Sequence, residues 1–246
     1  MTDAPSSSTR AGTATPGPGA SHHTDKARYG DTSQRIADGL RTAILAGELP
    51  PGSRIRQEEV AAQYGASRIP VRGALRILES DGLVKLVANS GAWVSQFDLG
   101  ECEEFYRIRE AVEPLLLSAS VPGLTSQALD RMDELAEEMA RTTEVERFLH
   151  LDREFHGLSY TGAKTVVLDE IVQRMWNMTH HYRLMFAQVF LEQGDTVVHD
   201  EHRMLVRALR EQDADQAGLV ACSHIRRTRR QLARHPELFG SSPARN

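Results

Sequence analysis

Long hydrophobic runs are absent from this sequence. None of its apolar stretches approaches the roughly 18 residues that a membrane-spanning helix requires, and the N-terminus lacks the charged-then-apolar pattern of a signal peptide. We therefore expect a cytoplasmic protein that does not enter a membrane. Hydrophobic residues still make up 40% of the 246 residues, which is enough to build real cores in two domains of ordinary size.

Cysteine is also scarce. The sequence contains two cysteines, Cys102 and Cys222, and their spacing matches no metal-binding pattern. This scarcity argues against a disulfide framework and against a thiolate zinc site. We expect two inert, buried thiols.

The chain has no overall positive charge, because its formal net charge is −5. The charges are unevenly distributed, however. Residues 31–97 carry eight basic and seven acidic residues, whereas residues 98–246 carry eighteen basic and twenty-five acidic residues. A nucleic-acid role would therefore belong to a local patch in the first of these parts, and the chain as a whole is not a polycation.

The first folded part begins with helical periodicity. Ile36, Leu40 and Ile44 repeat every four residues before "AGELPPG" ends the helix. A second helix is predicted at residues 57–64, and a third follows the turn at "YGAS" and runs to about residue 80. Ser67 is predicted to be the N-cap of this third helix, and Pro70 falls in its first turn, where the missing N–H costs nothing.

The pattern then changes to that of strands. The segments "LVKLV" and "AWVSQF" flank "ANSG", which predicts a β-hairpin with Asn and Gly in the turn. Three helices and a hairpin within about 70 residues fit a winged helix-turn-helix. No internal repeat is present.

The second folded part reads as helix almost throughout, and no strand-length alternation competes with this pattern. The predicted helices are residues 99–119, 126–142, 144–160, 164–190, 195–211 and 213–234. They predict an all-α helical bundle. The fold class is therefore mainly α, with an N-terminal winged helix-turn-helix that has a small β-hairpin wing.

These patterns divide the chain into four parts. Residues 1–30 are rich in Ser, Thr, Gly, Pro and Ala, and we expect a disordered tail there. Residues 31–97 are predicted to form the winged helix-turn-helix domain, and residues 98–235 the all-helical domain. Residues 236–246 are predicted to be a flexible C-terminal tail.

Three arginines share one face of the third helix. Arg68, Arg72 and Arg76 are four residues apart, so each is displaced by only about 40° around the axis. The apolar residues that we expect to pack against the first two helices lie on another arc: Val71, Ala74, Leu75 and Leu78. A solvated helix face is the ordinary interpretation of such a pattern. The hairpin that follows favours a DNA-reading role, because arginine bonds phosphates or the guanine edge.

Four motifs occur in order here: the PPG turn, S-R-x-P-V-R-x-A-L, L-x-x-x-G-L-V and the wing glycine of "NSGAWV". From about residue 34 to residue 94, the chain therefore resembles the N-terminal domain of the GntR family of bacterial transcription regulators. The resemblance implies DNA binding by the third helix, with Arg68 and Arg72 as principal contacts and Gly91 near the minor groove. The full predicted DNA-binding set is Ser67, Arg68, Pro70, Arg72, Arg76, Asn89 and Gly91.

One residue departs from the family pattern. Gly73 stands where the family usually has Glu. Glycine in a helix interior costs about 1 kcal/mol relative to alanine. We therefore expect a looser helix turn at this position and no side-chain contact from it.

The second part contains a candidate metal site in "HLDREFHGL". Asp152 and His156 are four residues apart, so on a helix both side chains project from one face and can chelate one ion. His202 and His224 lie on the last two predicted helices. Three imidazoles and one carboxylate suit a divalent cation, of which zinc is favoured over nickel or manganese. By residue type alone, other histidines are equally available: His150, His180, His181 and His199.

This all-helical part resembles the FCD domain, the ligand-binding domain of the FadR subfamily, over about residues 99–232. Its pattern of D-x-x-x-H in a middle helix and one histidine in each of the last two helices implies the ligand set Asp152, His156, His202 and His224. The family also has Arg-x-x-x-Glu in its first helix, here Arg109 and Glu113. The resemblance implies a small organic-acid effector, with Arg109 as its counter-charge. A surface pair between Arg109 and Glu113 is the alternative.

Three functions remain open at this point. The leading hypothesis is a transcription regulator, a repressor rather than an activator, that binds operator DNA as a homodimer and responds to a small carboxylate metabolite. The second is a metal-dependent hydrolase that uses the Asp/His₃ site, with Glu154 or Glu201 as a neighbouring acid or base. The third is a module without effector in which the metal is purely structural. The winged domain favours the regulator.

Overall fold

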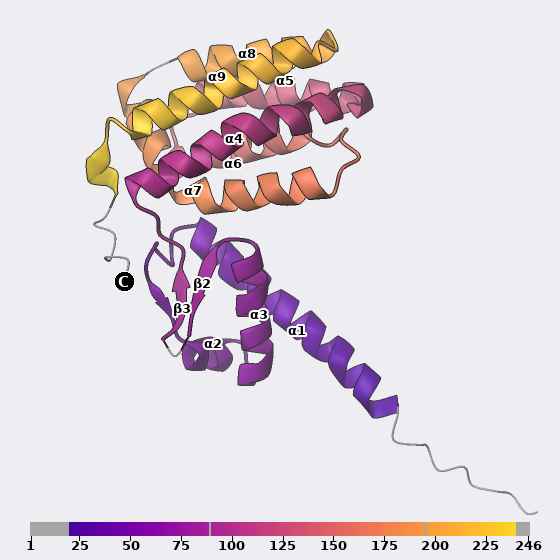
Figure 1. Cartoon of the computed structure of the whole chain (residues 1–246), viewed down its shortest axis with the longest axis vertical. Helices are drawn as coiled ribbons and strands as arrows, with labels where there is room; N and C mark the ends of the chain where they lie inside the picture. The colour runs from indigo at the N-terminus through magenta and orange to yellow at the C-terminus, as the bar shows by residue number, and fades with distance from the viewer. Residues whose placement is uncertain (1–19, 89, 195, 240–246) are drawn as a thin grey trace, which may run out of the picture.

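The computed structural model describes residues 20–88, 90–194 and 196–239. It contains an N-terminal domain and a helical bundle, which lie one above the other in Figure 1. The elements of the N-terminal domain are α1 (Ala20–Leu45), β1 (Arg54–Ile55), α2 (Gln57–Gln63), α3 (Arg68–Ser80), β2 (Val84–Val87) and β3 (Gly91–Val94). The elements of the bundle are α4 (Leu99–Ser120), η1 (Val121–Gly123), α5 (Ser126–Arg141), α6 (Val145–Ser159), α7 (Val167–Gln193), α8 (Val197–Arg210) and α9 (Ala214–Leu232), followed by η2 (Pro236–Leu238).

The N-terminal domain is built around the apolar face of α3. The four residues predicted to pack there are buried: Val71, Ala74, Leu75 and Leu78. They form one core with Ile36 and Leu40 of α1 and with the inner side of the sheet. The predicted hairpin is present as β2 and β3, which pair antiparallel. It is joined by β1, which the periodicity did not predict because two residues are too short to show alternation.

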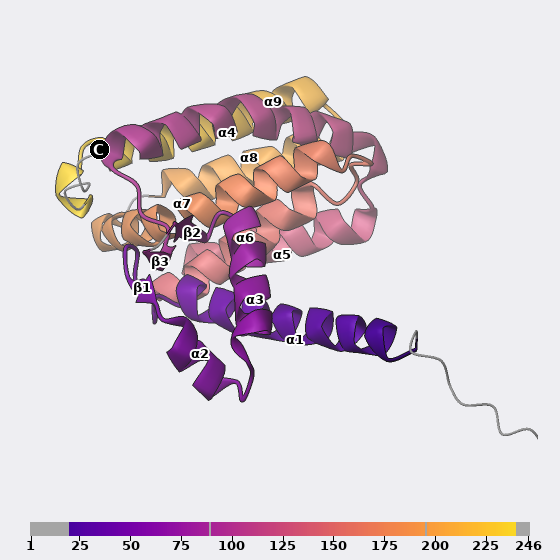
Figure 2. The ribbon, with the colours of Figure 1, turned by 60° about the horizontal axis from the view of Figure 1, so that its bottom comes forward.

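Helix α1 is longer than expected at its N-terminus. It begins at Ala20, so residues 20–30, which the composition predicts to be a disordered tail, have a helical backbone. Extending an existing helix fixes one residue per hydrogen bond and needs no new nucleus. The packed half of α1 therefore supports the added turns, which project away from both domains in Figures 1 and 2. Residues 1–19 lie outside the described residues, and the tail expected there stays a prediction.

The C-terminal end also differs from the expectation. Residues 236–238, assigned to a flexible tail, form the short helix η2, and Phe239 after it lies against Tyr182 of α7. The two rings are stacked with centroids 4.9 Å apart, which contributes apolar burial that a loose tail would lack. Residues 240–246 lie outside the described part of the chain.

The second domain is an all-α bundle, as predicted. Its core includes Leu116 of α4, Met132 and Leu135 of α5, Phe155 of α6 and Trp176 of α7. Helix α4 runs just below α9 in Figure 1, and the two lie together along the upper edge in Figure 2; α7 is at the lower edge of the bundle in Figure 1, next to the N-terminal domain. Among the described helices, none is long and apolar enough to cross a membrane.

Candidate DNA-binding face and metal centre

The arginines of α3 form an exposed face. Arg68, Arg72 and Arg76 are all exposed, whereas the opposite side of the same helix is buried. Arg72 and Arg76 form no ion pair within the described residues. Arg68 pairs with Glu58 of α2, with Nη2 and Oε1 3.0 Å apart. This partner lies on a neighbouring helix, so the spacing of residues within α3 did not reveal it.

An open groove of about 510 Å³ runs between α3 and the wing. Its lining includes all three arginines together with Gly91 at the start of β3. Gly91 has a φ of +111°, a conformation that favours glycine at this turn. Asn89 lies outside the described residues, so its predicted DNA contact stays a prediction.

The first turn of α3 corrects one expectation. Ser67 occupies the N-cap position with extended backbone angles, but its hydroxyl makes no capping hydrogen bond. The third helical residue is Pro70, whose nitrogen carries no hydrogen, so one of the two usual donors to the cap is missing. The hydroxyl of Ser67 therefore remains exposed at the N-terminus of α3. The Pro70 ring is buried in the core.

Two further residues shape this face. Arg54 of β1, which the sequence analysis missed, donates from Nη2 to the Ser90 carbonyl (3.0 Å) and lies over the Trp93 ring. It therefore adds a cation beside the wing turn. At Gly73, a Cβ atom would lie 2.5 Å from the hydroxyl oxygen of Ser33 on α1. The glycine allows this close approach of the two helices, which accounts for the departure from the family pattern.

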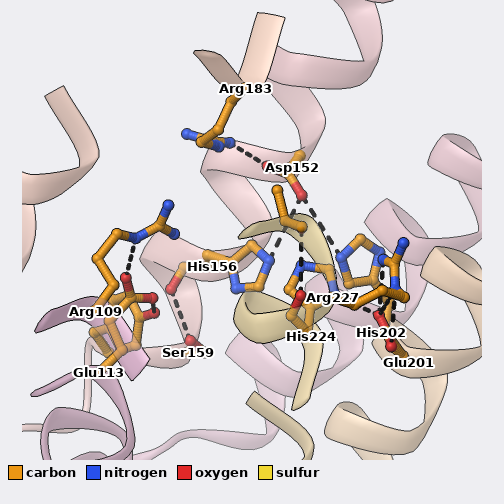
Figure 3. Close-up of polar contacts among 12 residues, drawn as sticks. Arg109, Glu113, Asp152, His156, Ser159, Arg183, Glu201, His202, His224 and Arg227 are labelled. Atoms are coloured by element: carbon orange, nitrogen blue, oxygen red, sulfur yellow. Dashed lines mark hydrogen bonds and ion pairs between the residues drawn. The ribbon is translucent and has the colours of Figure 1, made fainter. Parts of the chain in front are cut away.

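The candidate metal ligands come together inside the bundle. Asp152 and His156 lie on α6, His202 on α8 and His224 on α9, and one ligand atom from each lies within 4.8 Å of the others. The Oδ1 atom of Asp152 is 3.5 Å from Nε2 of His156 and 3.6 Å from Nε2 of His202. Figure 3 shows these side chains converging from the three helices. The structure thus joins residues that are far apart in the chain.

The chemistry of this cluster fits a bound cation. His202 is 1% exposed, and neither of its ring nitrogens has a hydrogen-bond partner within the described residues. Burial and the neighbouring imidazoles lower the pKa of His202 well below its usual value, and burial also lowers the pKa of His156. Both rings are therefore neutral near pH 7 and offer lone pairs, as a borderline divalent metal requires.

Two arginines form ion pairs at this cluster, one with the candidate ligand Asp152 and one with Glu201, which bonds the His224 ring. Arg183 of α7 contacts Oδ2 of Asp152; although burial acts to raise the pKa of Asp152, this guanidinium holds it well below the usual range. Glu201 accepts hydrogen bonds from Nδ1 of His224 (2.7 Å) and from Arg227 (2.9 Å from Nη2). A carboxylate on Nδ1 orients the imidazole and leaves Nε2 for a metal.

The two glutamates next to the candidate ligands in the sequence, Glu154 and Glu201, both form ion pairs with arginines. Glu201 is engaged as described, and its pKa is lowered by His224 and Arg227 against the effect of burial. Glu154 pairs with Arg131 of α5, with Oε1 and Nε 2.9 Å apart. Both glutamates are therefore paired with an arginine.

A small cavity of about 30 Å³ adjoins the cluster. Its lining includes Asp152, His156, His224, Arg109, Arg183, Tyr106 and Trp176. Arg109 is 4% exposed; its Nε donates to Glu113 (2.5 Å) and its Nη1 to Thr179 (3.2 Å). Glu113 also accepts the Tyr160 hydroxyl (2.7 Å). The pairing of Arg109 with Glu113 is therefore present, but it is buried and not on the surface.

Arg183 is a residue of this site that the sequence did not predict. Its guanidinium carbon lies 3.8 Å from the centroid of Trp176, one helical heptad earlier in α7. The Nη1 atom of Arg183, the hydroxyl of Tyr106 and Nε1 of Trp176 are buried without a hydrogen-bond partner in the described part of the chain. The cavity thus contains several unpaired donors. The one pattern in the sequence that indicates this contact is the spacing of Trp176 and Arg183, which are seven residues apart and therefore lie on the same face of α7.

Known proteins match both parts of the chain. Residues 32–94 match the family described as "Bacterial regulatory proteins, gntR family", and residues 104–227, about half of the chain, match the FCD domain. A helix-turn-helix transcriptional regulator in an unstable DNA locus of Streptomyces ambofaciens is 29% identical over 83% of this chain and 88% of that protein. The transcriptional repressor RspR of Escherichia coli is 23% identical over 78% of this chain and 85% of that protein.

Solved structures share the fold. McbR/YncC of E. coli superimposes with a TM-score of 0.69 at 21% identity, over 83% of this chain and 98% of that chain. The structure of a putative transcriptional regulator GntR from Rhodococcus sp. RHA1 superimposes with a TM-score of 0.68 at 22% identity, over 82% of this chain and 97% of that chain. Since the relatives are transcriptional regulators, the hydrolase hypothesis is rejected. The chain belongs to the GntR family of bacterial transcription regulators and carries an FCD domain behind its helix-turn-helix.

Proposed function

We propose that this regulator is a repressor that binds a palindromic operator as a homodimer and is released by a small organic acid bound beside a divalent metal. The observation that carries this proposal is the buried Asp152, His156, His202 and His224 cluster, which adjoins a cavity lined by two arginines. We assign DNA binding to residues 31–97 and sensing to residues 98–235. The protein then acts in the bacterial cytoplasm, where the operator is.

DNA recognition is assigned to the N-terminal end of α3 and the wing. The exposure of Arg68, Arg72 and Arg76 and the groove beside Gly91 support this assignment. The hydroxyl of Ser67 lies at the helix N-terminus, where free N–H groups favour a phosphate. Pro70 contributes by shaping the first turn, and Asn89 remains a candidate for a backbone contact from the wing.

The Arg72→Ala variant tests this assignment. We expect it to weaken operator binding by about 5- to 150-fold, as loss of a base or phosphate contact does, while the thermal midpoint is unchanged. Arg230→Ala, at an exposed position of α9, is the matched control. Operator sites are first obtained by in vitro selection, and affinity is measured by fluorescence anisotropy at several salt concentrations. Equal affinity of both variants would refute the assignment.

The homodimer follows from DNA geometry. A single recognition helix reads few base pairs, and paired half-sites about 34–36 Å apart supply the missing selectivity. Sedimentation velocity of the protein, alone and on a selected operator, measures the stoichiometry. One chain per operator at saturation would contradict this part of the proposal.

The metal is assigned to the Asp/His₃ cluster, with zinc favoured over nickel and manganese for this ligand set. The His156→Ala/His224→Ala double variant should lose the metal, as measured by mass spectrometry of the purified protein. His150→Ala, at an exposed position on the same helix, should retain one metal ion per chain. Retention of stoichiometric metal by the double variant would show that the ligands are wrong.

The effector is assigned to the adjoining cavity. Arg183 and Arg109 supply positive charge there, and a carboxylate matches a guanidinium fork. A panel of small carboxylic acids added to the zinc-loaded protein on operator DNA should contain members that release the DNA. Arg183→Gln should remove this response. If every acid in the panel leaves the DNA bound, the effector part of the proposal fails.

A further inference from the structure

Helix α7 contacts both the candidate metal centre and the N-terminal domain. One side of α7 carries Arg183, which contacts Asp152, and Thr179, which accepts from Arg109. Another side carries Arg174, Asn177 and His180, which contact the N-terminal domain. Figure 1 shows α7 lying between the rest of the bundle and that domain. The same rigid helix thus touches the ligand site and the DNA-reading domain.

Helix α7 completes the C-terminal end of α3, the helix to which DNA recognition is assigned and which is called the recognition helix below. Helix α3 ends with a glycine-terminated turn, in which the Leu83 N–H bonds the Leu78 carbonyl (2.9 Å) and the Gly82 N–H bonds the Glu79 carbonyl (3.0 Å). Arg174 donates from Nη1 to the carbonyls of Glu79 (3.0 Å) and Ser80. A cation at a helix C-terminus also complements the helix dipole. The bundle therefore supplies part of the cap of α3.

Asn177 contacts the next carbonyl. Its Nδ2 donates to the Asp81 carbonyl (3.3 Å), while the Asp81 carboxylate accepts from Arg41 of α1 (2.6 Å). The turn lies so close to α7 that a Cβ atom at Gly82 would be 2.5 Å from Cγ of Met178. The end of α3 is thus fixed between α1 and α7.

His180 makes an equivalent contact to α1. Its Nε2 lies 2.9 Å from the carbonyl of Leu45, the last residue of α1. Because a carbonyl only accepts, Nε2 carries the proton and donates. Arg174, Asn177 and His180 are three residues apart, and they satisfy carbonyls at the C-terminal ends of α3 and α1, which helices cannot satisfy internally.

A direct connection leads from this contact to the metal ligands. Arg153 follows Asp152 in α6, and its Nη2 donates to Oδ1 of Asn177 (2.7 Å). Asn177 therefore bonds simultaneously to the neighbour of a candidate ligand and to the turn that ends the recognition helix. A shift of α6 at Asp152 reaches Asp81 through two hydrogen bonds.

We propose that Arg174 and Asn177 are positioning residues for DNA recognition, and that the Arg153–Asn177–Asp81 connection couples occupancy of the metal centre to the placement of α3. The proposal rests on the function assigned above. The coupled element has two arrangements: the end of α3 held by α7, or released from it. Metal binding favours one of them, and by thermodynamic linkage DNA binding alters metal affinity by the same factor.

The test is a thermodynamic cycle on the full-length protein. Affinity for a selected operator is measured with and without zinc in the wild type, in Asn177→Ala and in Arg147→Ala. The last is the control, because Arg147 is on α6 but bonds Glu138 of α5. Zinc should change the wild-type affinity by about fivefold or more, the usual lower bound for allosteric coupling. The ratio of operator affinities with and without zinc should be unchanged in Arg147→Ala. It should fall below about twofold in Asn177→Ala, although this variant should still bind one zinc per chain.

Two further measurements separate positioning from general stability. Hydrogen exchange of residues 79–86 should respond to zinc in the wild type and not in Asn177→Ala, because the amides of Gly82 and Leu83 report the end of α3. Arg174→Lys, which keeps a cationic donor, should retain operator affinity that Arg174→Ala loses. An unchanged zinc ratio in Asn177→Ala overturns the proposal, as does a wild type that binds both operator and zinc without coupling. A wild type that binds no operator or no zinc overturns the proposed function as well.

Discussion

Replacing His202 by leucine tests whether this buried histidine is present for metal binding. The side chain is 1% exposed and both ring nitrogens lack hydrogen-bond partners within the described residues. In the metal-free protein, the desolvation of such an unpaired group lowers the free energy of unfolding by about 1–3 kcal/mol. Leucine has a similar volume and no polar atom. We therefore expect His202→Leu to stabilise the metal-free protein by up to this amount, whereas most core substitutions destabilise.

Zinc should reverse the order of the two proteins. A ligand present at about 1,000 times its dissociation constant stabilises the folded state by about 4.1 kcal/mol. The wild type gains this stabilisation and His202→Leu forgoes it, and it exceeds the cost of about 1–3 kcal/mol for the unpaired histidine. Thermal unfolding after chelation, and again after zinc addition, measures both quantities. One kcal/mol corresponds to about 2–4 °C for a chain of 150–250 residues.

The control is His150→Leu, at an exposed position of α6, which should change stability by less than about 0.5 kcal/mol and respond to zinc as the wild type does. A metal-free His202→Leu protein that melts well below the wild type would refute the desolvation argument. A full zinc response in that variant would show that His202 is not a ligand.

Three other predictions address stability. Glu113→Gln should lower the free energy of urea unfolding by about 3–5 kcal/mol because it leaves a buried arginine unpaired. Glu103→Gln, which removes a 3.8 Å pair with the exposed Arg107, should lower it by less than about 1 kcal/mol; similar losses would contradict this. Gly82→Ala should destabilise more than Gly47→Ala, since both have φ of +78° but only Gly82 is crowded by α7. Stability of the metal-free protein should fall as the pH drops below about 6.5, because buried His202 has a lowered pKa and the unfolded state takes up its proton first; a flat profile from pH 7 to 5 would count against this.

Local patterns in the sequence predicted the helices well. The helices of the bundle begin and end within a few residues of the expected positions, because each buries a stripe of apolar residues that recurs every three or four positions. The same reasoning separated the buried Leu75 from the exposed Arg72 on α3. Strand β1 escaped this reasoning, since Arg54 and Ile55 form a strand only through their pairing with Trp93 and Ala92.

Contacts between distant segments were beyond this reasoning. The spacing of Asp152 and His156 pointed to a shared helix face, but only the resemblance to a family selected His202 and His224 from the other histidines. The link between Arg183 and Asp152 joins α7 to α6. Its existence depends on how the two helices pack, which no local pattern encodes.

The size of the cavity connects effector binding to helix α7. A volume of about 30 Å³ admits about two water molecules, whereas pockets for small organic ligands span about 300–1,000 Å³. The organic acid proposed as effector would therefore enter only if the lining moves. Three of the lining residues, Trp176, Arg183 and Phe186, belong to α7. The same helix holds the end of α3 through Arg174 and Asn177, so under the function proposed above we expect opening of the cavity to shift the end of α3.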